Sequence, residues 1–295
     1  MKQIALLLAA VGACGGSPQI PPAEPSTPPV STAPSAGASQ TPAVTPPPAA
    51  GPQPGVMAAS SASPPRSATA PSPIVDAPDR SDQDRALDPG RHPLELLAFA
   101  GIKPGMHVAD LQAGGGYTTE ILARAVGPGG VVYSQNNKFV ASRAEKPWSE
   151  RLAKPALANV KRVDRELGDP LPPQAHDLDA VFLVLFYHDA VWMGADLDKM
   201  NRAIFAALKP GGEYIVVDHS AQEGSGVRDV KTFHRIDERT VEDQISRAGF
   251  RLAQSADFLR NPKDARDWND SPSAAGDRRG TSDRFVLKFV RPEAH

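Results

Sequence analysis

Two histidine and aspartate pairs are the residues of this sequence best suited to chemistry. His188 and Asp189 follow an apolar, strand-like run, and Asp218 and His219 end the next strand-like segment. A histidine titrates near neutral pH, and a carboxylate beside it can orient its ring for proton transfer. Because ligands of open α/β sheets bind at the carboxyl ends of the strands, we expect both pairs to face one site.

A three-glycine turn is the second such feature. Gly114, Gly115 and Gly116 lie between a predicted strand that contains Asp110 and a predicted helix over 117–125. Glycines let the backbone approach a ligand closely, and the helix N-terminus offers free N–H groups. Asp110 and the three glycines are therefore our candidate cofactor-binding residues.

The elements that must position these residues alternate between strand-length and helix-length segments, which is typical of an α/β sheet protein. Strands are expected at 107–111, 130–133, 160–163, 180–186, 213–218, 250–258 and 284–290. Helices are expected at 93–100, 117–125, 197–208 and 238–248, with a further helical piece near 148–157 that Pro155 interrupts.

The order of these features resembles a class I S-adenosylmethionine-dependent methyltransferase. A strand, a glycine turn and a helix are followed by Lys-Pro-Gly-Gly at 209–212 before a strand, and by a last strand near the C-terminus. The resemblance runs from about residue 90 to residue 292. It implies a Rossmann-like sandwich with a mostly parallel seven-stranded sheet, helices on both faces, an antiparallel last strand, and S-adenosylmethionine as cofactor.

A narrower resemblance rests on five segments, namely 216–221, 224–226, 234–237, 257–262 and 283–289. Together they look like a bacterial group of predicted methyltransferases that are often exported. The group has no established substrate, so this resemblance implies a fold and a cofactor and leaves the methyl acceptor open.

The sequence departs from the methyltransferase pattern at two positions. Gln112 stands where the first glycine of the turn is usual, and Asn136 stands where an acidic residue usually holds the cofactor ribose. An amide can bond a ribose hydroxyl but lacks the charge assistance of a carboxylate. Asp164 and Glu166 follow the third strand, where an acidic side chain of methyltransferases commonly contacts the adenine amine. Either residue fits that role, and the alternative is that both are surface carboxylates in a loop.

A dinucleotide is the main competitor for the glycine turn. Its fingerprint requires a third glycine three residues after Gly116, where this chain has Thr119, and an acidic residue where it has Asn136. We favour S-adenosylmethionine chiefly because of the Lys-Pro-Gly-Gly segment before a strand and the C-terminal segment, rather than because of the glycines.

Methyl transfer is an in-line displacement, so the protein mainly aligns donor and acceptor and removes a proton where the acceptor carries one. We expect His219 or His188 to be the base and Asp189 or Asp218 to orient it, with His234 folding over the same opening. The alternative is that these side chains only tie loops to the sheet edge.

A divalent metal is a further option. Asp189, Asp218 and His219 lie where catechol-type methyltransferases place metal ligands, although our preferred interpretation has no metal.

The N-terminus resembles a bacterial lipoprotein signal. One lysine precedes a ten-residue apolar run over 4–13, which is too short to span a bilayer, and Cys14, the only cysteine in the chain, follows Val-Gly-Ala. We expect residues 1–13 to be cleaved and Cys14 to carry lipid on the periplasmic side of a bacterial membrane. Gly15 in place of an aspartate favours the outer membrane.

Composition divides the rest of the chain. Residues 17–75 hold 17 of the 31 prolines, two charged residues and no aromatic residue, so they cannot bury enough apolar surface to fold. We expect 14–75 to be a disordered tether and 76–295 to be one methyltransferase-like domain. That domain carries 30 basic and 33 acidic side chains, a net charge of −3 without a dense basic run, which argues against nucleic acid as a partner.

Two classes of function fit these observations. The first is an enzyme that methylates a small molecule or an envelope component. The second is a non-catalytic binding or assembly module that reuses the fold, since S-adenosylmethionine is made in the cytoplasm and fold does not fix function. The oligomeric state stays open.

Overall fold

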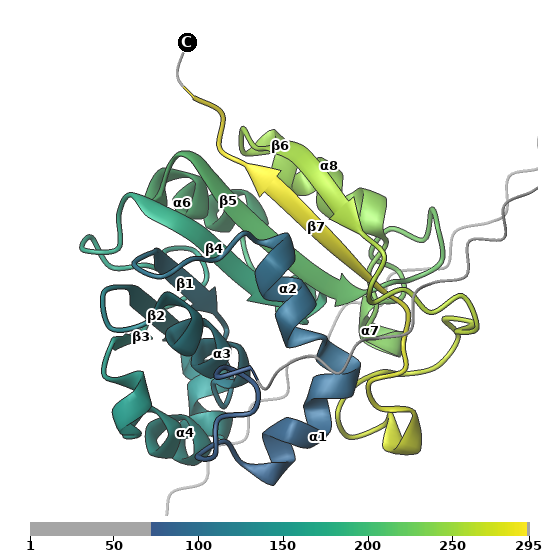
Figure 1. Ribbon diagram of the computed structural model, residues 1–295. Coiled ribbons are helices and arrows are strands. Elements are labelled where there is room, and N and C mark those ends of the chain that lie inside the picture. Colours follow the sequence, from purple (N-terminus) through teal and green to yellow (C-terminus); the bar gives the residue numbers. More distant parts are fainter. Residues whose placement is uncertain (1–71, 294–295) are drawn as a thin grey trace, which may run out of the picture. The chain divides into compact units, whose positions relative to one another are not determined.

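A computed structural model describes residues 72–293, which form a seven-stranded sheet with helices on both faces (Figure 1). The strand order is β3-β2-β1-β4-β5-β7-β6. Neighbours from β3 to β5 pair in parallel, and β7 pairs antiparallel with both β5 and β6. The strands are β1 (His107–Leu111), β2 (Val131–Asn136), β3 (Val160–Asp164), β4 (Leu178–Val184), β5 (Leu208–His219), β6 (Arg251–Ala256) and β7 (Arg284–Val290). The predicted fold class is confirmed.

Helices cover the two faces because the central strands are apolar on both sides. Phe182 of β4 faces the core cluster formed with α2 (Pro93–Phe99) and α3 (Tyr117–Val126). Leu183, the next residue, faces the cluster formed with α6 (Leu197–Ala207) and α8 (Glu238–Arg247). Both side chains are fully buried, as expected for a parallel strand inside a sheet.

The carboxyl ends of β1, β4 and β5 lie next to one another at one edge of the sheet. Asp110 of β1 pairs with Phe182 of β4, and His219 at the end of β5 pairs with Arg284 at the start of β7. Figure 1 shows α1 (Asp82–Arg91), α7 (Val230–Phe233) and the loop before β7 gathered at this edge. The chain therefore brings segments from both ends of the domain around one opening.

Charged contacts attach α1 to the rest of the domain. Arg151 of α4 (Lys138–Leu152) forms ion pairs with Asp84 of α1 and Glu120 of α3, and its Nε donates to the Gly115 carbonyl. The side chains of these three residues are no more than 14% exposed. Their ion pairs hold α1 beside the glycine turn.

Several boundaries differ from the sequence prediction. Residues 187–192, to which the sequence prediction assigned no helix or strand, form α5 (Tyr187–Trp192), and the helix expected near 148 begins already at Lys138, where Asn137 caps it. The helix α1 was not predicted. Short 3₁₀ turns complete the chain at Pro155–Leu157 and Gly276–Arg278.

The predicted signal peptide, Cys14 and most of the predicted tether lie outside the described residues. The tether was expected to end at residue 75, and the structure shows Ile74 and Val75 packed against the core. Within residues 72–293, no helix has both the length and the apolarity that crossing a membrane requires.

Candidate active site

A cavity of about 760 Å³ opens at the carboxyl edge of the sheet, and we call it the central cavity. Its walls come from α1, the glycine turn, the start of α3, the ends of β4 and β5, α5, the residue after α7, and the loop before β7. The candidate residues among them are Asp110, Gly114, Gly115, His188, Asp189, His219 and His234, joined by Arg91, Asp270, Arg279 and Arg284. The predicted convergence of the glycine turn and the histidine clusters on one opening is therefore present in the structure.

The glycine turn depends on left-handed backbone at three residues. Gly114 and Gly116 have φ values of 57° and 81°, and Gln112 has a φ of 53°. The Gln112 backbone N–H and its side-chain amide both donate to Gln135 Oε1, at 3.0 and 3.2 Å. These hydrogen bonds hold a glutamine in a conformation that favours glycine, at the position where methyltransferases usually have glycine.

The structure places Asn136 differently from our expectation. Its Oδ1 accepts from the Gly114 N–H at 2.9 Å, and its Nδ2 donates to the Gly114 carbonyl at 3.0 Å. The side chain is fully buried, and it does not line the central cavity. Asn136 thus shapes the glycine turn instead of presenting its amide to a ribose.

Asp110 is the buried acid at the end of β1. It accepts a hydrogen bond from Thr119 Oγ1 at 2.6 Å, and Thr119 in turn contacts Ser134. Burial raises the pKa of Asp110 from 3.8 to about 7, because the hydrogen bonds to Thr119 and the Arg91 charge only partly offset the loss of hydration. Among the described residues no cation forms an ion pair with Asp110, so its carboxylate can receive a cationic ligand in the cavity.

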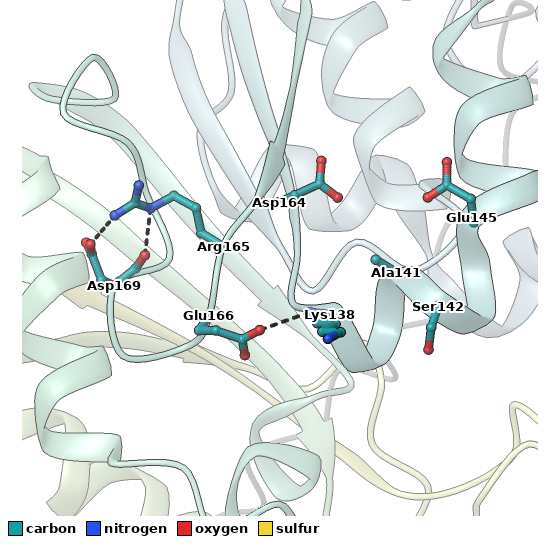
Figure 2. A pocket seen from close by; sticks show the side chains of 8 residues that line it. All are labelled: Lys138, Ala141, Ser142, Glu145, Asp164, Arg165, Glu166 and Asp169. Carbon is teal, nitrogen blue, oxygen red and sulfur yellow. Dashed lines mark hydrogen bonds and ion pairs between the residues drawn. The ribbon is translucent and has the colours of Figure 1, made fainter.

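The acids after β3 lie at a second, shallower hollow between α4 and the loop that follows β3. Figure 2 shows its lining, including Asp164 and Glu166, with Glu166 directed toward Lys138. Asp164 is half exposed and accepts two hydrogen bonds from Arg162, at 2.8 and 2.9 Å. Glu166 accepts from the Lys138 backbone N–H at 3.3 Å. Both acids face the hollow, so both remain candidates for an adenine contact.

His188, in the wall of the central cavity, forms a close pair with the buried Asp218. Asp218 Oδ1 lies 2.6 Å from His188 Nδ1, and Asp218 Oδ2 accepts from the His188 backbone N–H. Burial alone would raise the pKa of Asp218, but the charges of His188 and His219 outweigh it and hold that pKa below its usual value. Burial opposes the charge on His188, yet Asp218 keeps the His188 pKa raised. This is one of the pairings that the sequence predicted.

His219 has a different partner from the ones we expected. Its Nδ1 lies 2.5 Å from Asp270 Oδ2 and 2.9 Å from Ser282 Oγ. Burial lowers the pKa of His219, with Asp270 opposing that shift, so the ring favours its neutral form. Asp218 accepts the backbone N–H of His219 and is not the partner of its ring. Asp270 and Ser282 come from the loop before β7, where the sequence carries no motif that marks them.

The third histidine, His234, lies over the same opening, as predicted. Its Nδ1 is 3.3 Å from Asp189 Oδ1, and its ring centroid is 5.3 Å from that of His188. Asp189 therefore lies between His188 and His234. The metal set considered from the sequence is not assembled, because Asp218 is buried beneath His188 and bonded to it.

Three arginines that sequence analysis missed complete the cavity wall. Arg91 lies over the Tyr117 ring, 4.4 Å from its centroid, while Arg279 and Arg284 come from the segment that leads into β7. In the described part of the chain, none of the three forms an ion pair with a carboxylate. Burial lowers the pKa of both Arg91 and Arg284, because the negative groups near them only partly offset the loss of hydration.

The strand order and the glycine turn define a class I S-adenosylmethionine-dependent methyltransferase. A chain from the complex of the Haloferax volcanii Trm112 methyltransferase activator with a methyltransferase has the same fold, with a TM-score of 0.52 and 17% identity over 72% of this chain and 94% of that one. A methyltransferase from Aquifex aeolicus matches with a TM-score of 0.49 and 20% identity over 72% of this chain and 99% of that chain.

The family model of protein-L-isoaspartate(D-aspartate) O-methyltransferase matches residues 91–248, more than half of the chain, and the chain belongs to this family. A protein-L-isoaspartate O-methyltransferase from Triticum aestivum is 30% identical over 151 residues. That match covers 46% of this chain and 60% of the relative, so the chain spans less than two thirds of the length of this relative.

Proposed function

We propose that this protein transfers a methyl group from S-adenosylmethionine to a carboxylate oxygen of an acceptor at a bacterial membrane. The observation that carries the proposal is the group of arginines in the central cavity that form no ion pair within residues 72–293. Arg284 is 5% exposed, and within the same range its guanidinium bonds only the carbonyls of Gly280 and Ser282. An arginine fork of this kind matches the planar geometry of a carboxylate. The wheat relative is named for methylation of a protein carboxylate, which is the same acceptor chemistry.

The residues at the glycine turn fit the cofactor. S-adenosylmethionine carries a sulfonium and an ammonium charge, and Asp110 offers a buried carboxylate without a cationic partner beside backbone N–H groups at the start of α3. Arg91 lies beside this turn, where the cofactor's own carboxylate is the nearest anion to bind. When bound, the cofactor supplies an electrophilic methyl group.

The reaction needs little from the protein beyond alignment. A carboxylate oxygen attacks the methyl carbon as the carbon–sulfur bond breaks, which yields a methyl ester and S-adenosylhomocysteine. The acceptor is already ionised at neutral pH, so no proton has to be removed. The ester is uncharged, so Arg284 holds it less strongly than the acid, and this difference favours product release.

The chemical nature of the transferred methyl group tests this proposal. The full chain would be incubated with methyl-labelled S-adenosylmethionine and with either bacterial membranes or a peptide that contains isoaspartate, using the matching aspartate peptide as control. We expect label that mild base releases as volatile methanol, which is the behaviour of a carboxyl methyl ester. Label that resists base would assign the acceptor to nitrogen or phenolic oxygen and overturn the proposal.

Replacing Arg284 with methionine should weaken binding of the acceptor. A hydrogen bond to a charged group contributes about 1.5–3 kcal/mol, so we expect the acceptor KM to rise about 10- to 100-fold with little change in the Kd for S-adenosylmethionine. Arg278→Met is the matched control, because Arg278 lies over Trp268 and does not line the cavity. Equal KM values for the two variants would remove Arg284 from acceptor binding.

We also propose that lipid on Cys14 holds the protein on the membrane. The support is the signal-like sequence before Cys14 and the proline-rich segment behind it. Several acyl chains, at about 0.8 kcal/mol per buried CH₂, are enough for stable anchoring. We expect Cys14→Ser to move the protein from the membrane to the soluble fraction of fractionated cells, while Ser17→Ala should leave it on the membrane. Membrane retention of Cys14→Ser would contradict this assignment.

A further inference from the structure

Three potential metal ligands converge on one point of the central cavity. His188 and Asp189 lie in α5, His234 follows α7, and one ligand atom from each lies within 4.8 Å of the other two. His188 Nε2 is 3.5 Å from Asp189 Oδ1, and His234 Nδ1 is 3.3 Å from the same oxygen. Two imidazoles and a carboxylate form a donor set that suits divalent transition metals.

The distances fit a metal better than they fit direct hydrogen bonds. N–H···O bonds are about 2.7–3.2 Å long, so both contacts exceed that range. Two ligands that are each about 2.0–2.1 Å from a tetrahedral ion lie roughly 3.4 Å apart. The separations of 3.3 and 3.5 Å are therefore those expected around one shared ion.

His234 supplies an independent observation. Its Nδ1 is buried and has no hydrogen-bond partner among the described residues. The residue ends α7 in a left-handed conformation, with a φ of 53°, which histidine adopts more readily than most side chains. A buried nitrogen lone pair directed at a carboxylate and a second histidine is explained by an ion between them.

Asp218 gives His188 the orientation of a metal ligand. Its carboxylate is 2.6 Å from His188 Nδ1, so Nδ1 carries the ring proton and Nε2 presents its lone pair to Asp189 and His234. A carboxylate behind a histidine is the usual outer partner of metal-bound imidazole. Asp218 is fully buried and is therefore held rigidly in that role.

We propose that His188, Asp189 and His234 bind a divalent transition-metal ion of the zinc type, with Asp218 as the outer partner of His188. The contacts that support these four assignments all lie within the described residues. The three ligands line the central cavity. They leave at least one coordination position open toward it, as catalytic zinc sites do. An oxygen of the acceptor can occupy that position.

Binding of Zn²⁺ measured by calorimetry, and of Co²⁺ measured by its visible absorption, tests the site without any need for enzymatic activity. The full chain would carry Cys14→Ser in every sample, which removes the only thiol as a competing ligand. We expect one ion per chain and Co²⁺ bands of a four- or five-coordinate ion, with no competition from Mg²⁺.

Loss of a ligand should weaken binding strongly. We expect His234→Ala and Asp189→Asn each to raise the Kd for Zn²⁺ about 100-fold or more, and Asp218→Asn to raise it about 10- to 100-fold. His176→Ala is the control, because that histidine is 70% exposed and lies outside the cavity. Asp189 and His234 are partly exposed, so their variants should remain folded, and thermal melting checks this. Absence of stoichiometric binding, or equal affinity in His234→Ala, Asp189→Asn and His176→Ala, would overturn the proposal.

Discussion

Arg235→Met is expected to lower the free energy of unfolding by about 3–5 kcal/mol, the range for removing one partner of a buried ion pair. The Arg235 and Asp264 side chains are 0% and 1% exposed, and they lie 2.8 Å apart. Methionine approximates the length of the arginine stem but leaves the Asp264 charge buried without a cation. Urea denaturation followed by circular dichroism measures the effect.

The same arginine connects the sheet to the loop that closes the cavity. Its Nη1 donates to the Ser220 carbonyl at the end of β5, and its Nε donates to the Trp268 carbonyl, both at 3.1 Å. Asp264 also accepts from the backbone N–H of Asp283. This loop places Asp270 beside His219. Arg235→Met should therefore reduce methyl transfer at temperatures where the rest of the domain is still folded.

Two comparisons separate the buried charge from a general loss of packing. Arg239→Met removes an exposed arginine from α8 and should change stability by no more than about 1 kcal/mol. The double variant Arg235→Met, Asp264→Asn removes the unpaired charge and should recover part of the loss. Equal destabilisation by Arg235→Met and Arg239→Met would show that the buried pair is not what stabilises this loop.

Much of the fold could be predicted because local patterns determine it. The apolar run before Tyr187 has the character of a strand covered on both faces, and β4 is such a strand. The glycine turn between β1 and α3 was expected from residue types alone, since Gly114 and Gly116 need left-handed backbone. The helix α1 escaped prediction because its sequence is mostly polar and contains Pro89, and because contacts with Arg151 and Tyr117 stabilise it.

The site was predictable only where chain order and sheet order agree. Asp218 lies at the end of β5, and His188 lies in the helix that follows the end of the adjacent strand β4, so their proximity follows from the parallel sheet. Asp270, which lies beside His219, comes from an irregular loop whose path depends on the buried Arg235 pair. Nothing in the local sequence reports such long-range contacts.

Asn136 shows how a correct location can still give the wrong role. It does end β2, as the sequence indicated, but its amide bonds both polar groups of Gly114. A carboxylate at this position could accept the Gly114 N–H but could not donate to the carbonyl. The amide is therefore coupled to the unusual turn, which also has Gln112 in a left-handed conformation.

Asp110→Asn is expected to make the domain more stable above neutral pH and to flatten the dependence of its stability on pH. Burial raises the pKa of Asp110 in the folded state to about 7, whereas the unfolded chain has the ordinary value of 3.8. Between these two values the folded state binds the extra proton, so the free energy of unfolding falls as pH rises. At 1.36 kcal/mol per pH unit, the full difference is on the order of 4 kcal/mol.

The measurement is urea denaturation of parent and variant at a series of pH values. Asparagine retains an acceptor for Thr119 Oγ1 and carries no charge, so the stability of Asp110→Asn should match the parent near pH 4 and exceed it progressively up to about pH 8. Asp164→Asn is the control, because Asp164 is half exposed and paired with Arg162. Parallel curves for parent and Asp110→Asn would mean that Asp110 titrates as an ordinary carboxylate.

Affinity for the cofactor should rise with pH, whereas the free energy of unfolding falls. S-adenosylmethionine is cationic at its amine and sulfur, so it favours the ionised form of Asp110, and binding lowers the pKa of that carboxylate. With a pKa of about 7 the ionised fraction rises roughly tenfold between about pH 6 and pH 8, and the Kd for S-adenosylmethionine should fall by up to that factor. Calorimetric titration of the full chain measures it, and Asp110→Asn should bind weakly at every pH. A variant that kept the parent's pH dependence would show that another group senses the cofactor charge. Loss of the pH dependence in Asp110→Asn would show that the cost in stability and the gain in affinity arise from the same buried carboxylate at the end of β1.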